Sequence, residues 1–239
     1  MMNKVLFGDC RETLKTIDTK ARMCVTSPPY YGLRNYGDED RQIGMEQSPE
    51  EYIAEMVKVF RSVRDVLTDD GTLWLNIGDT YYNYRSDGNY PKQTVSRTKQ
   101  DLPNFSPVRG NKLQGLKSKD LIGIPWMLAF ALRADGWWLR QDIIWNKPNP
   151  MPESVKDRCT KSHEYIFLLS KSKQYFYDNE AIKEPVKQDW GERDRTSGKY
   201  HNPGTGLQPH SGLTKSYDRK NKRSVWTCLL YTSPSPRDS

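Results

Sequence analysis

An α/β fold is predicted by short apolar runs that alternate with amphipathic helical patterns along the 239-residue chain. Strands are predicted at residues 23–25, 72–77 and 137–145, and the helical patterns begin at residues 48 and 121. Alternation of this kind is typical of an α/β domain in which helices cover a sheet. The length suffices for one large domain, or for a domain with a sizeable insertion.

At the amino end, an apolar run at residues 4–7 predicts a short strand, and Gly8-Asp9 predicts the turn that ends it. A short helix follows, with Leu14 and Ile17 on its buried face. Asp9 has two interpretations. Either it contacts a ligand outside the carboxyl end of a strand, where ligands bind in α/β folds, or it is the N-cap of the helix.

The apolar run Met23-Cys24-Val25 leads into a stiff corner, Thr26-Ser27-Pro28-Pro29-Tyr30. Each proline fixes its own φ, and the second proline biases the first away from helix. The corner therefore offers a hydroxyl, a fixed carbonyl and an aromatic ring, which suit a planar ring that bears an exocyclic amine. An ordinary turn at the end of a strand is the alternative.

The clearest helix begins at Ser48, which precedes a proline at the first helical position and Glu51 at the third, a capping box. Apolar residues then recur at helical spacing, so this helix covers a sheet and is structural. We expect Asp70-Gly71 to end the helix and residues 72–77 to form a buried strand. Asp79 follows that strand, where it either orients a site residue or caps the next element, and we favour a supporting role.

Beyond residue 120 the pattern predicts a second helix, two further strands and a hairpin. The helix covers residues 121–134 and ends at Asp135-Gly136, and its leucines at 121, 128 and 132 share one face. Strands follow at residues 137–145 and 163–169, and residues 174–177 predict a hairpin strand at the edge of the sheet.

The formal charge of +7 is unevenly distributed along the chain. Residues 38–70 hold ten acidic and four basic residues, whereas residues 85–119 hold eight basic and two acidic ones. Residues 183–223 hold ten basic and five acidic residues. Two basic segments that are rich in Gly, Pro, Ser and Asn suit contacts with a phosphate backbone. The alternative is that these segments are simply soluble loops.

The composition also limits the class of protein. No apolar run reaches the roughly 18 residues of a membrane span, and the amino end does not read as a secretory signal. The four cysteines show no spacing typical of zinc ligands, so we expect reduced thiols in a cytoplasmic protein and no metal site.

Four motifs together identify a family resemblance. Residues 26–37, preceded by Gly8-Asp9-Cys10, strongly resemble the amino-methyltransferases of DNA, and further matches lie at residues 71–79, 142–148 and 163–167. Enzymes of that family methylate N4 of cytosine or N6 of adenine with S-adenosylmethionine. The order of motifs resembles the subgroup in which the catalytic motif comes first and the glycine-rich cofactor motif comes late. The resemblance covers most of residues 3–178.

The resemblance implies a Rossmann-like methyltransferase sheet with helices on both faces, incomplete and interrupted by long basic insertions. It implies one catalytic domain at residues 1–227, in which residues 82–118 and 184–224 are the candidate DNA-contact and target-recognition segments. Residues 228–239 resemble the in-frame translation of a sequencing adapter and are expected to be non-native. The family's glycine-rich cofactor loop would lie beyond residue 227, so an inactive fragment that binds DNA weakly is one alternative.

The resemblance also assigns site residues. It implies that Ser27 and the Pro28 carbonyl accept hydrogen bonds from the amine of an extruded base, in the rigid corner made by Pro29, while Tyr30 stacks on the base. Near the cofactor it implies Asp9 and Thr26. The candidate DNA contacts that it implies are Tyr31, Arg34, Tyr36 and Lys147, of which the two tyrosines could instead pack under their loop, and Lys147 could be structural.

Serine at the first motif position is commoner in the cytosine-N4 enzymes of the family, so the resemblance favours cytosine N4 over adenine N6. Methylation of a protein amide or of an RNA base is a further alternative, because related motifs serve those reactions. The implied partner is double-stranded DNA, and a cognate restriction endonuclease is a candidate partner. The sequence gives neither the recognition site nor the oligomeric state.

Overall fold

The computed structural model describes residues 4–33, 42–82, 113, 115–186, 193–194, 213–214 and 218–228. The chain divides into two compact units. The first comprises Met1–Phe176 with Ser224–Ser239, and the second comprises Tyr177–Arg223.

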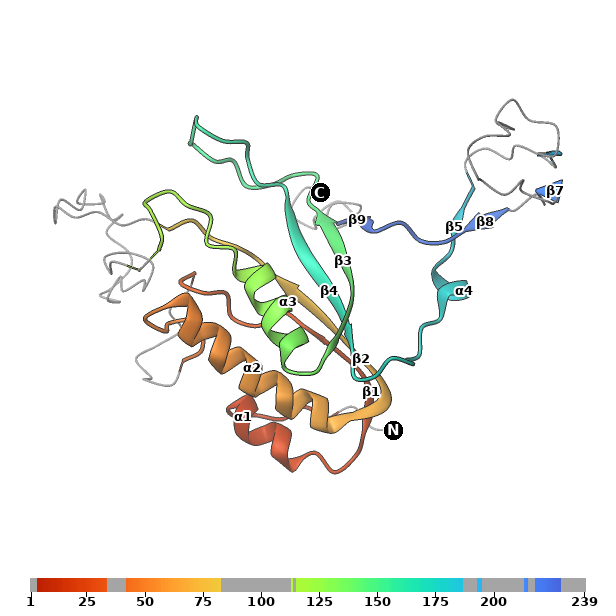
Figure 1. Ribbon diagram of the computed structural model, residues 1–239, viewed down its shortest axis with the longest axis horizontal. Coiled ribbons are helices and arrows are strands. Elements are labelled where there is room, and N and C mark those ends of the chain that lie inside the picture. Colours follow the sequence, from red (N-terminus) through yellow and green to blue (C-terminus); the bar gives the residue numbers. More distant parts are fainter. Residues whose placement is uncertain are drawn as a thin grey trace, which may run out of the picture. The chain divides into compact units, whose positions relative to one another are not determined.

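The first unit is built on a five-stranded mixed sheet in the order β1-β2-β4-β3-β9. Strand β4 is antiparallel to both of its neighbours, whereas β1 is parallel to β2 and β3 is parallel to β9. The carboxyl ends of β1 and β2 therefore meet the amino end of β4 at one edge (Figure 1). The predicted α/β class is confirmed. The strands are β1 (Ala21–Thr26), β2 (Leu67–Ile77), β3 (Trp138–Asn146), β4 (His163–Ser170) and β9 (Val225–Thr227).

Figure 1 shows the helices of this unit on one side of the sheet. Their apolar residues form one core with the face of β2 that carries Leu73, Leu75 and Ile77, all 0% exposed. Among the described residues of the unit, helices lie on this face alone, and the second layer of helices expected from the sequence is not among them. The elements are α1 (Cys10–Thr13), the 3-10 helix η1 (Leu14–Thr16), α2 (Pro49–Val66) and α3 (Ile124–Ala134).

Helix α2 begins as the sequence predicts. The Glu51 N–H donates to Ser48 Oγ over 3.2 Å, and Glu51 Oε2 accepts from the Gln47 N–H over 3.0 Å. One unpaired donor of the first helical turn and the N–H of the residue before the N-cap are thus satisfied. This amphipathic helix places Tyr52, Met56 and other residues in the core.

The end of α2 differs from the prediction, because the helix stops at Val66 and β2 starts at Leu67. The Asp70-Gly71 pair lies inside β2, where the register with β1 shifts from Ala21 opposite Leu67 to Met23 opposite Thr72. A Cβ on Gly71 would lie 2.8 Å from the Thr68 carbonyl oxygen, so the irregular strand requires glycine there.

Three other element predictions are corrected. Residues 4–7 form no strand with any described residue, and Phe7 is 90% exposed. Leu121 precedes α3, because the left-handed φ of Gly123 (+89°) delays the helix until Ile124. Residues 174–177 form no strand. They cannot pair with β4 in a hairpin, because β2 and β3 already occupy both sides of β4.

One aromatic contact reports the curvature of the sheet. Trp74 on β2 and Trp226 on β9 stack with ring centroids 5.8 Å apart, although β4 and β3 lie between those strands in the sheet order. Side chains from strands three places apart meet in this way only if the sheet curls.

The second unit consists of short elements, namely α4 (Asn179–Ile182), β5 (Glu184–Pro185) paired with β8 (Arg219–Lys220), and β6 (Arg193–Asp194) paired with β7 (Leu213–Thr214). It overlaps the basic segment at residues 184–224. Lys222 and Arg223 form ion pairs with Glu184, and these partners hold the pKa of Glu184 down at about 2 against the opposing effect of desolvation.

Much of the sequence-based interpretation falls outside the described residues. This holds for residues 83–112 of the first basic segment and for residues 229–239 of the tail. Within the part of the chain that the structure describes, none of the helices has both the length and the apolar character needed to cross a membrane.

Candidate functional site

The Ser-Pro-Pro-Tyr corner follows the last residue of β1 and is anchored on α2. The Tyr52 hydroxyl donates to the Pro29 carbonyl over 2.8 Å. Among the described residues no donor reaches the Pro28 carbonyl, and the Ser27 side chain is exposed. One carbonyl of the corner thus holds it in place, while the other remains an acceptor.

The side chains of the corner meet two polar residues of the sheet. The Tyr30 hydroxyl lies 2.8 Å from Asn76 Oδ1 and 3.1 Å from Glu164 Oε2. Ser27 Oγ lies 3.2 Å from the Tyr30 hydroxyl and 3.3 Å from Asn76 Oδ1. Lys147 Nζ forms an ion pair with Glu164 Oε1. These five residues form a continuous polar network, which we call the corner network.

The strand register explains why residues so far apart in sequence meet here. Asn76 lies directly opposite Ile166 in the antiparallel β2–β4 pair, so both point to the same face. Glu164 precedes Ile166 by two residues and shares that face, because side chains alternate along a strand. Lys147 follows β3, and its N–H bonds the Ser162 carbonyl over 2.8 Å, which continues the same ladder.

Two glycines leave room for Tyr30. A Cβ on Gly78 would lie 2.6 Å from Tyr30 Cε2, closer than van der Waals contact allows. A Cβ on Gly44 would lie 3.1 Å from the Tyr30 carbonyl oxygen, and Gly44 has a φ of +98° that disfavours other residues. The position of the ring therefore depends on the absence of side chains at both sites.

The electrostatic surroundings keep Tyr30 neutral at ordinary pH. Desolvation by burial is the largest cause that raises the pKa of Tyr30 to about 12; the hydrogen bond from Ser27 lowers this pKa, and the charge of Glu164 raises it. A neutral phenol retains its proton and donates it to an acceptor in the corner network.

Tyr31 packs in the hydrophobic core. Its side chain is 1% exposed and its ring centroid lies 5.5 Å from that of Tyr52. Its hydroxyl has no hydrogen-bond partner among the described residues. The sequence left packing under the loop as the alternative, and the burial supports that alternative.

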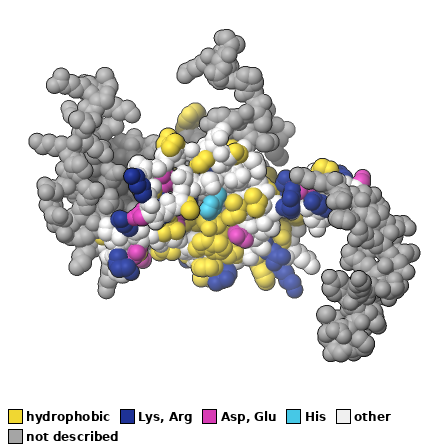
Figure 2. Space-filling view, turned by 90° about the horizontal axis from the view of Figure 1, so that it is seen from above, with side chains coloured by type: hydrophobic (Ala, Val, Ile, Leu, Met, Phe, Trp, Pro, Cys, Tyr) yellow, Lys and Arg dark blue, Asp and Glu magenta, His cyan; other side chains and the backbone are white. Residues whose placement is uncertain are grey.

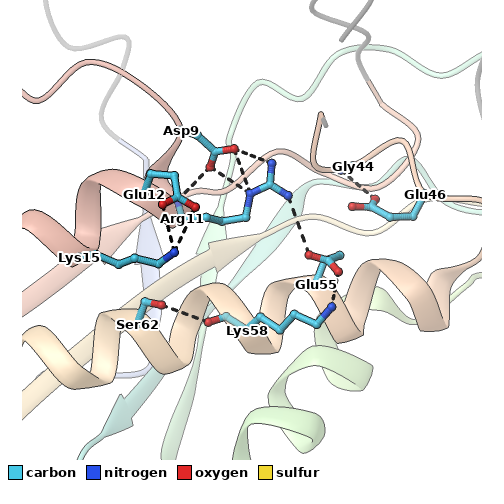
Figure 3. Close-up of polar contacts among 9 residues, drawn as sticks. All are labelled: Asp9, Arg11, Glu12, Lys15, Gly44, Glu46, Glu55, Lys58 and Ser62. Carbon is cyan, nitrogen blue, oxygen red and sulfur yellow. Dashed lines mark hydrogen bonds and ion pairs between the residues drawn. The ribbon is translucent and has the colours of Figure 1, made fainter. Parts of the chain in front are cut away.

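Asp9 caps α1 and pairs with Arg11, as Figure 3 shows. Asp9 Oδ1 accepts from the Arg11 N–H over 2.9 Å, and the Arg11 guanidinium contacts both carboxylate oxygens at 2.5–3.0 Å. Arg11 also lies 3.9 Å from Glu55 on α2. The capping interpretation of Asp9 is confirmed, and its contact with a cofactor stays a prediction.

Asp79 has the supporting role expected from the sequence. Its carboxylate accepts from the backbone N–H groups of Thr80 (2.9 Å), Gly123 (3.0 Å) and Ile124 (3.1 Å), which holds the start of α3 beside the end of β2. Burial raises the pKa of Asp79 and lowers the pKa of the neighbouring Lys161, whose Nζ lies 3.5 Å from the Asp79 carbonyl oxygen.

The structure thus brings Ser27, Pro28, Tyr30 and Lys147 together, with half-buried Thr26 one residue away. Arg34 and Tyr36 lie outside the described residues. The sequence-based reasoning missed Asn76 and Glu164. The signal that could have found them was a polar residue near the end of one mostly apolar strand, 72–77, and another near the start of the next, 163–169.

Apolar surface is extensive on this protein. Figure 2 shows hydrophobic side chains gathered into a patch on the face seen from the top of Figure 1. Several large apolar side chains of the first unit are well exposed, among them Met23 (57%) and Val25 (69%) on β1.

Comparisons with known proteins agree with these motifs. The sequence is similar to the type II methyltransferase M.SmaI of Serratia marcescens, with 47% identity over 98% of this chain and 68% of that protein. It is 51% identical to M.Cfr9I of Citrobacter freundii over 79% of this chain, and 50% identical to M.XycI of Xanthomonas campestris pv. cyanopsidis over 75% of it. The chain spans 60% and 58% of the lengths of these last two relatives.

Among solved structures, the PvuII DNA methyltransferase (cytosine-N4-specific) aligns over 73% of this chain and 51% of its own, with 15% identity and a TM-score of 0.48. The family model described as DNA methylase, for the N6 and N4 enzymes, matches residues 21–237. With this match and with 47% identity to a relative of which it covers about two thirds, the chain belongs to the N6/N4 DNA methylase family.

Proposed function

We propose that this chain carries the base-binding part of a site-specific DNA methyltransferase that acts on the N4 amine of a flipped-out cytosine. The observation that supports the proposal is the pair of hydrogen-bond acceptors in the corner. Ser27 Oγ lies 3.2 Å from the Tyr30 hydroxyl on an exposed side chain, and the Pro28 carbonyl, one residue on, accepts from no donor among the described residues.

An exocyclic amine needs such acceptors because its lone pair is delocalised into the ring, which makes the nitrogen a poor nucleophile. The amine is also paired and stacked in duplex DNA, so the base must leave the helix before reaction. Unpairing costs a few kcal/mol, which contacts with the extruded base have to offset.

The residues of the corner have separate roles in this mechanism. Ser27 Oγ and the Pro28 carbonyl accept one amine hydrogen each, which shifts electron density toward the nitrogen and fixes the direction of its lone pair. The ring of Tyr30 supports the base by stacking. Most of the rate gain comes from positioning the amine, which can lower the activation free energy by several kcal/mol. Hydrogen bonds to the positive charge that develops on the amine lower it further.

S-adenosylmethionine supplies the methyl group on a sulfonium when it is bound. The described residues fit the amine side of this transfer better than the cofactor side. Asp9, the carboxylate expected beside the adenosine, is engaged by Arg11, whereas Thr26 is half-buried at the end of β1. No step is therefore assigned to a cofactor contact.

Double-stranded DNA is the proposed substrate, with Arg34, Tyr36, Lys147 and the two basic segments as candidate contacts and a cognate restriction endonuclease as a candidate partner. Phosphate contacts of Lys and Arg would position the duplex, and their contribution would weaken with salt.

A digest of methylated DNA tests the proposal. The full chain is incubated with duplex DNA and S-adenosylmethionine that carries a labelled methyl group, and the DNA is then hydrolysed to nucleosides. We expect N4-methyl-2′-deoxycytidine as the labelled product. N6-methyl-2′-deoxyadenosine would assign the chain to the adenine-N6 reaction instead, and label in protein or RNA alone, when these are offered beside the DNA, would reject DNA as the substrate.

A further inference from the structure

We propose that Glu164, held by Lys147, is a positioning residue that directs the hydroxyl protons of Tyr30 and Ser27 inward, so that Ser27 Oγ presents only lone pairs to the target amine. The inference rests on the proposed function, because the acceptor role of Ser27 in methyl transfer would depend on Glu164 and Lys147. It follows from the hydrogen-bonding capacity of each member of the corner network.

The orientation of Asn76 is fixed first. Its Nδ2 donates to the Tyr165 carbonyl over 3.3 Å, which turns Oδ1 toward the corner. An amide oxygen only accepts hydrogen bonds. Asn76 can therefore only accept a proton from either hydroxyl group and offers them none.

Glu164 is fixed next. Its side chain is 19% exposed, and its Oε1 is paired with Lys147 Nζ, which leaves Oε2 beside the Tyr30 hydroxyl at 3.1 Å. A carboxylate that is paired with an ammonium group offers acceptors only. A second acceptor thus lies on the inner side of Tyr30.

The protons can then be counted. Tyr30 has one hydroxyl proton and two acceptors, Asn76 Oδ1 and Glu164 Oε2. Ser27 has one proton, and it lies 3.2 Å from the Tyr30 oxygen and 3.3 Å from Asn76 Oδ1. Both protons point inward, because every inner partner is an acceptor or a hydroxyl whose own proton is already donated.

The outward side of Ser27 Oγ consequently carries lone pairs. A hydroxyl that could rotate would offer its proton to a base part of the time, and an amine hydrogen would then find no acceptor. Replacement of Glu164 by glutamine introduces an N–H donor next to Tyr30, which allows the chain of protons to reverse.

The first test measures methyl transfer by the full chain. For Glu164→Gln we expect kcat to fall by about ten- to a hundredfold, as for a small misplacement of reacting groups, with KM for DNA unchanged. Glu164→Asp retains the carboxylate and should recover part of the loss. The matched control is Glu153→Gln, which removes a comparably buried ion pair with Arg158 outside the network and should leave kcat unchanged.

A double-mutant cycle checks that Glu164 acts through Tyr30. In a Tyr30→Phe background the proton that Glu164 accepts is gone, so Glu164→Gln should have little further effect on kcat. Full additivity of the two losses, or equal kcat for Glu164→Gln and Glu153→Gln, would overturn the inference.

A readout without methyl transfer separates this inference from the proposed function. 3-Fluorotyrosine at position 30 is titrated by fluorine NMR, because fluorine lowers the phenol pKa into a range where the fold survives. Glu164→Gln should lower that pKa and Glu153→Gln should not. If the unaltered chain methylates no base, the proposed function fails while this titration still decides the inference: an unshifted pKa in Glu164→Gln refutes it.

Discussion

The hydroxyl of Tyr52, on α2, donates a 2.8 Å hydrogen bond to the carbonyl of Pro29 in the corner. The prolines restrict the backbone locally, but this contact fixes the corner to the core. Tyr52 is 0% exposed, and its neighbours on α2 pack against β2. The position of the proposed base site is therefore set by a helix with no residue in the site itself.

The Tyr52 hydrogen bond should contribute measurably to stability. Tyr52→Phe leaves the Pro29 carbonyl without this donor, and we expect a loss of about 1 kcal/mol in the free energy of unfolding, measured by urea denaturation. Tyr31→Phe is the control, because it removes a buried hydroxyl that has no partner among the described residues. That change should be neutral or stabilising, and equal losses in the two variants would contradict the assignment.

Alkaline pH should weaken the fold through the buried tyrosines. Burial raises the pKa of Tyr30 to about 12 and raises those of Tyr31 and Tyr52 as well. The folded chain thus holds phenol protons that the unfolded chain releases near pH 10. The free energy of unfolding therefore keeps the full contribution of these tyrosines below about pH 10, and it falls as the pH rises toward the pKa values of the tyrosines in the folded state. Unfolding free energies between about pH 8 and about pH 11 should fall less steeply for Tyr52→Phe than for the unaltered chain.

Gly78→Ala should disturb Tyr30 directly. The added methyl group would lie 2.6 Å from Tyr30 Cε2, so the ring has to shift, and we expect kcat for methyl transfer to fall at least about tenfold. Gly115→Ala serves as the comparison, since a Cβ there contacts nothing within 4 Å and only the φ of +83° is strained. The Gly115→Ala variant should lose about 1 kcal/mol in the free energy of unfolding and retain its kcat. An unchanged kcat in Gly78→Ala would show that the position of the Tyr30 ring does not matter for methyl transfer.

Ser27→Ala tests the acceptor itself. Removing Oγ should lower kcat about a hundredfold, while the dissociation constant for DNA, measured by fluorescence anisotropy, should change little because Ser27 contributes no charge. Unchanged turnover would remove Ser27 from the mechanism.

Asp79→Ala tests the hydrogen bonds that connect the end of β2 to the start of α3. Three backbone N–H groups lose their acceptor, and we expect a loss of about 1–2 kcal/mol in unfolding free energy. Asp79→Asn keeps an acceptor oxygen and should lose less. A negligible effect of alanine would show that other groups hold α3.

The sequence predicted those features that depend on local chemistry. The stiffness of the corner follows from two consecutive prolines, and the start of α2 follows from Ser48 and Glu51, whose hydrogen bonds lie within four residues of each other. Asp9 was also identified as a possible cap of the helix that follows it, and its bond to the Arg11 N–H spans two residues.

Features that depend on pairing between distant strands were not predicted. The early start of β2 requires Ala21 to face Leu67, and the burial of Tyr31 requires Tyr52 beside it. The approach of Glu164 to Tyr30, 134 residues apart, requires the register of β2 with β4. No local pattern carries that information.

The stacked indoles of Trp74 and Trp226 provide a spectroscopic handle on the last strand. Two tryptophans at this separation couple their excited states, which gives a circular-dichroism band of a kind that isolated indoles lack. Since Trp226 belongs to β9, the band should persist while β9 stays attached to β3 and vanish when that strand detaches. Its decay on heating, compared with the loss of helical signal, would tell whether the sheet opens at β9 before its remainder melts.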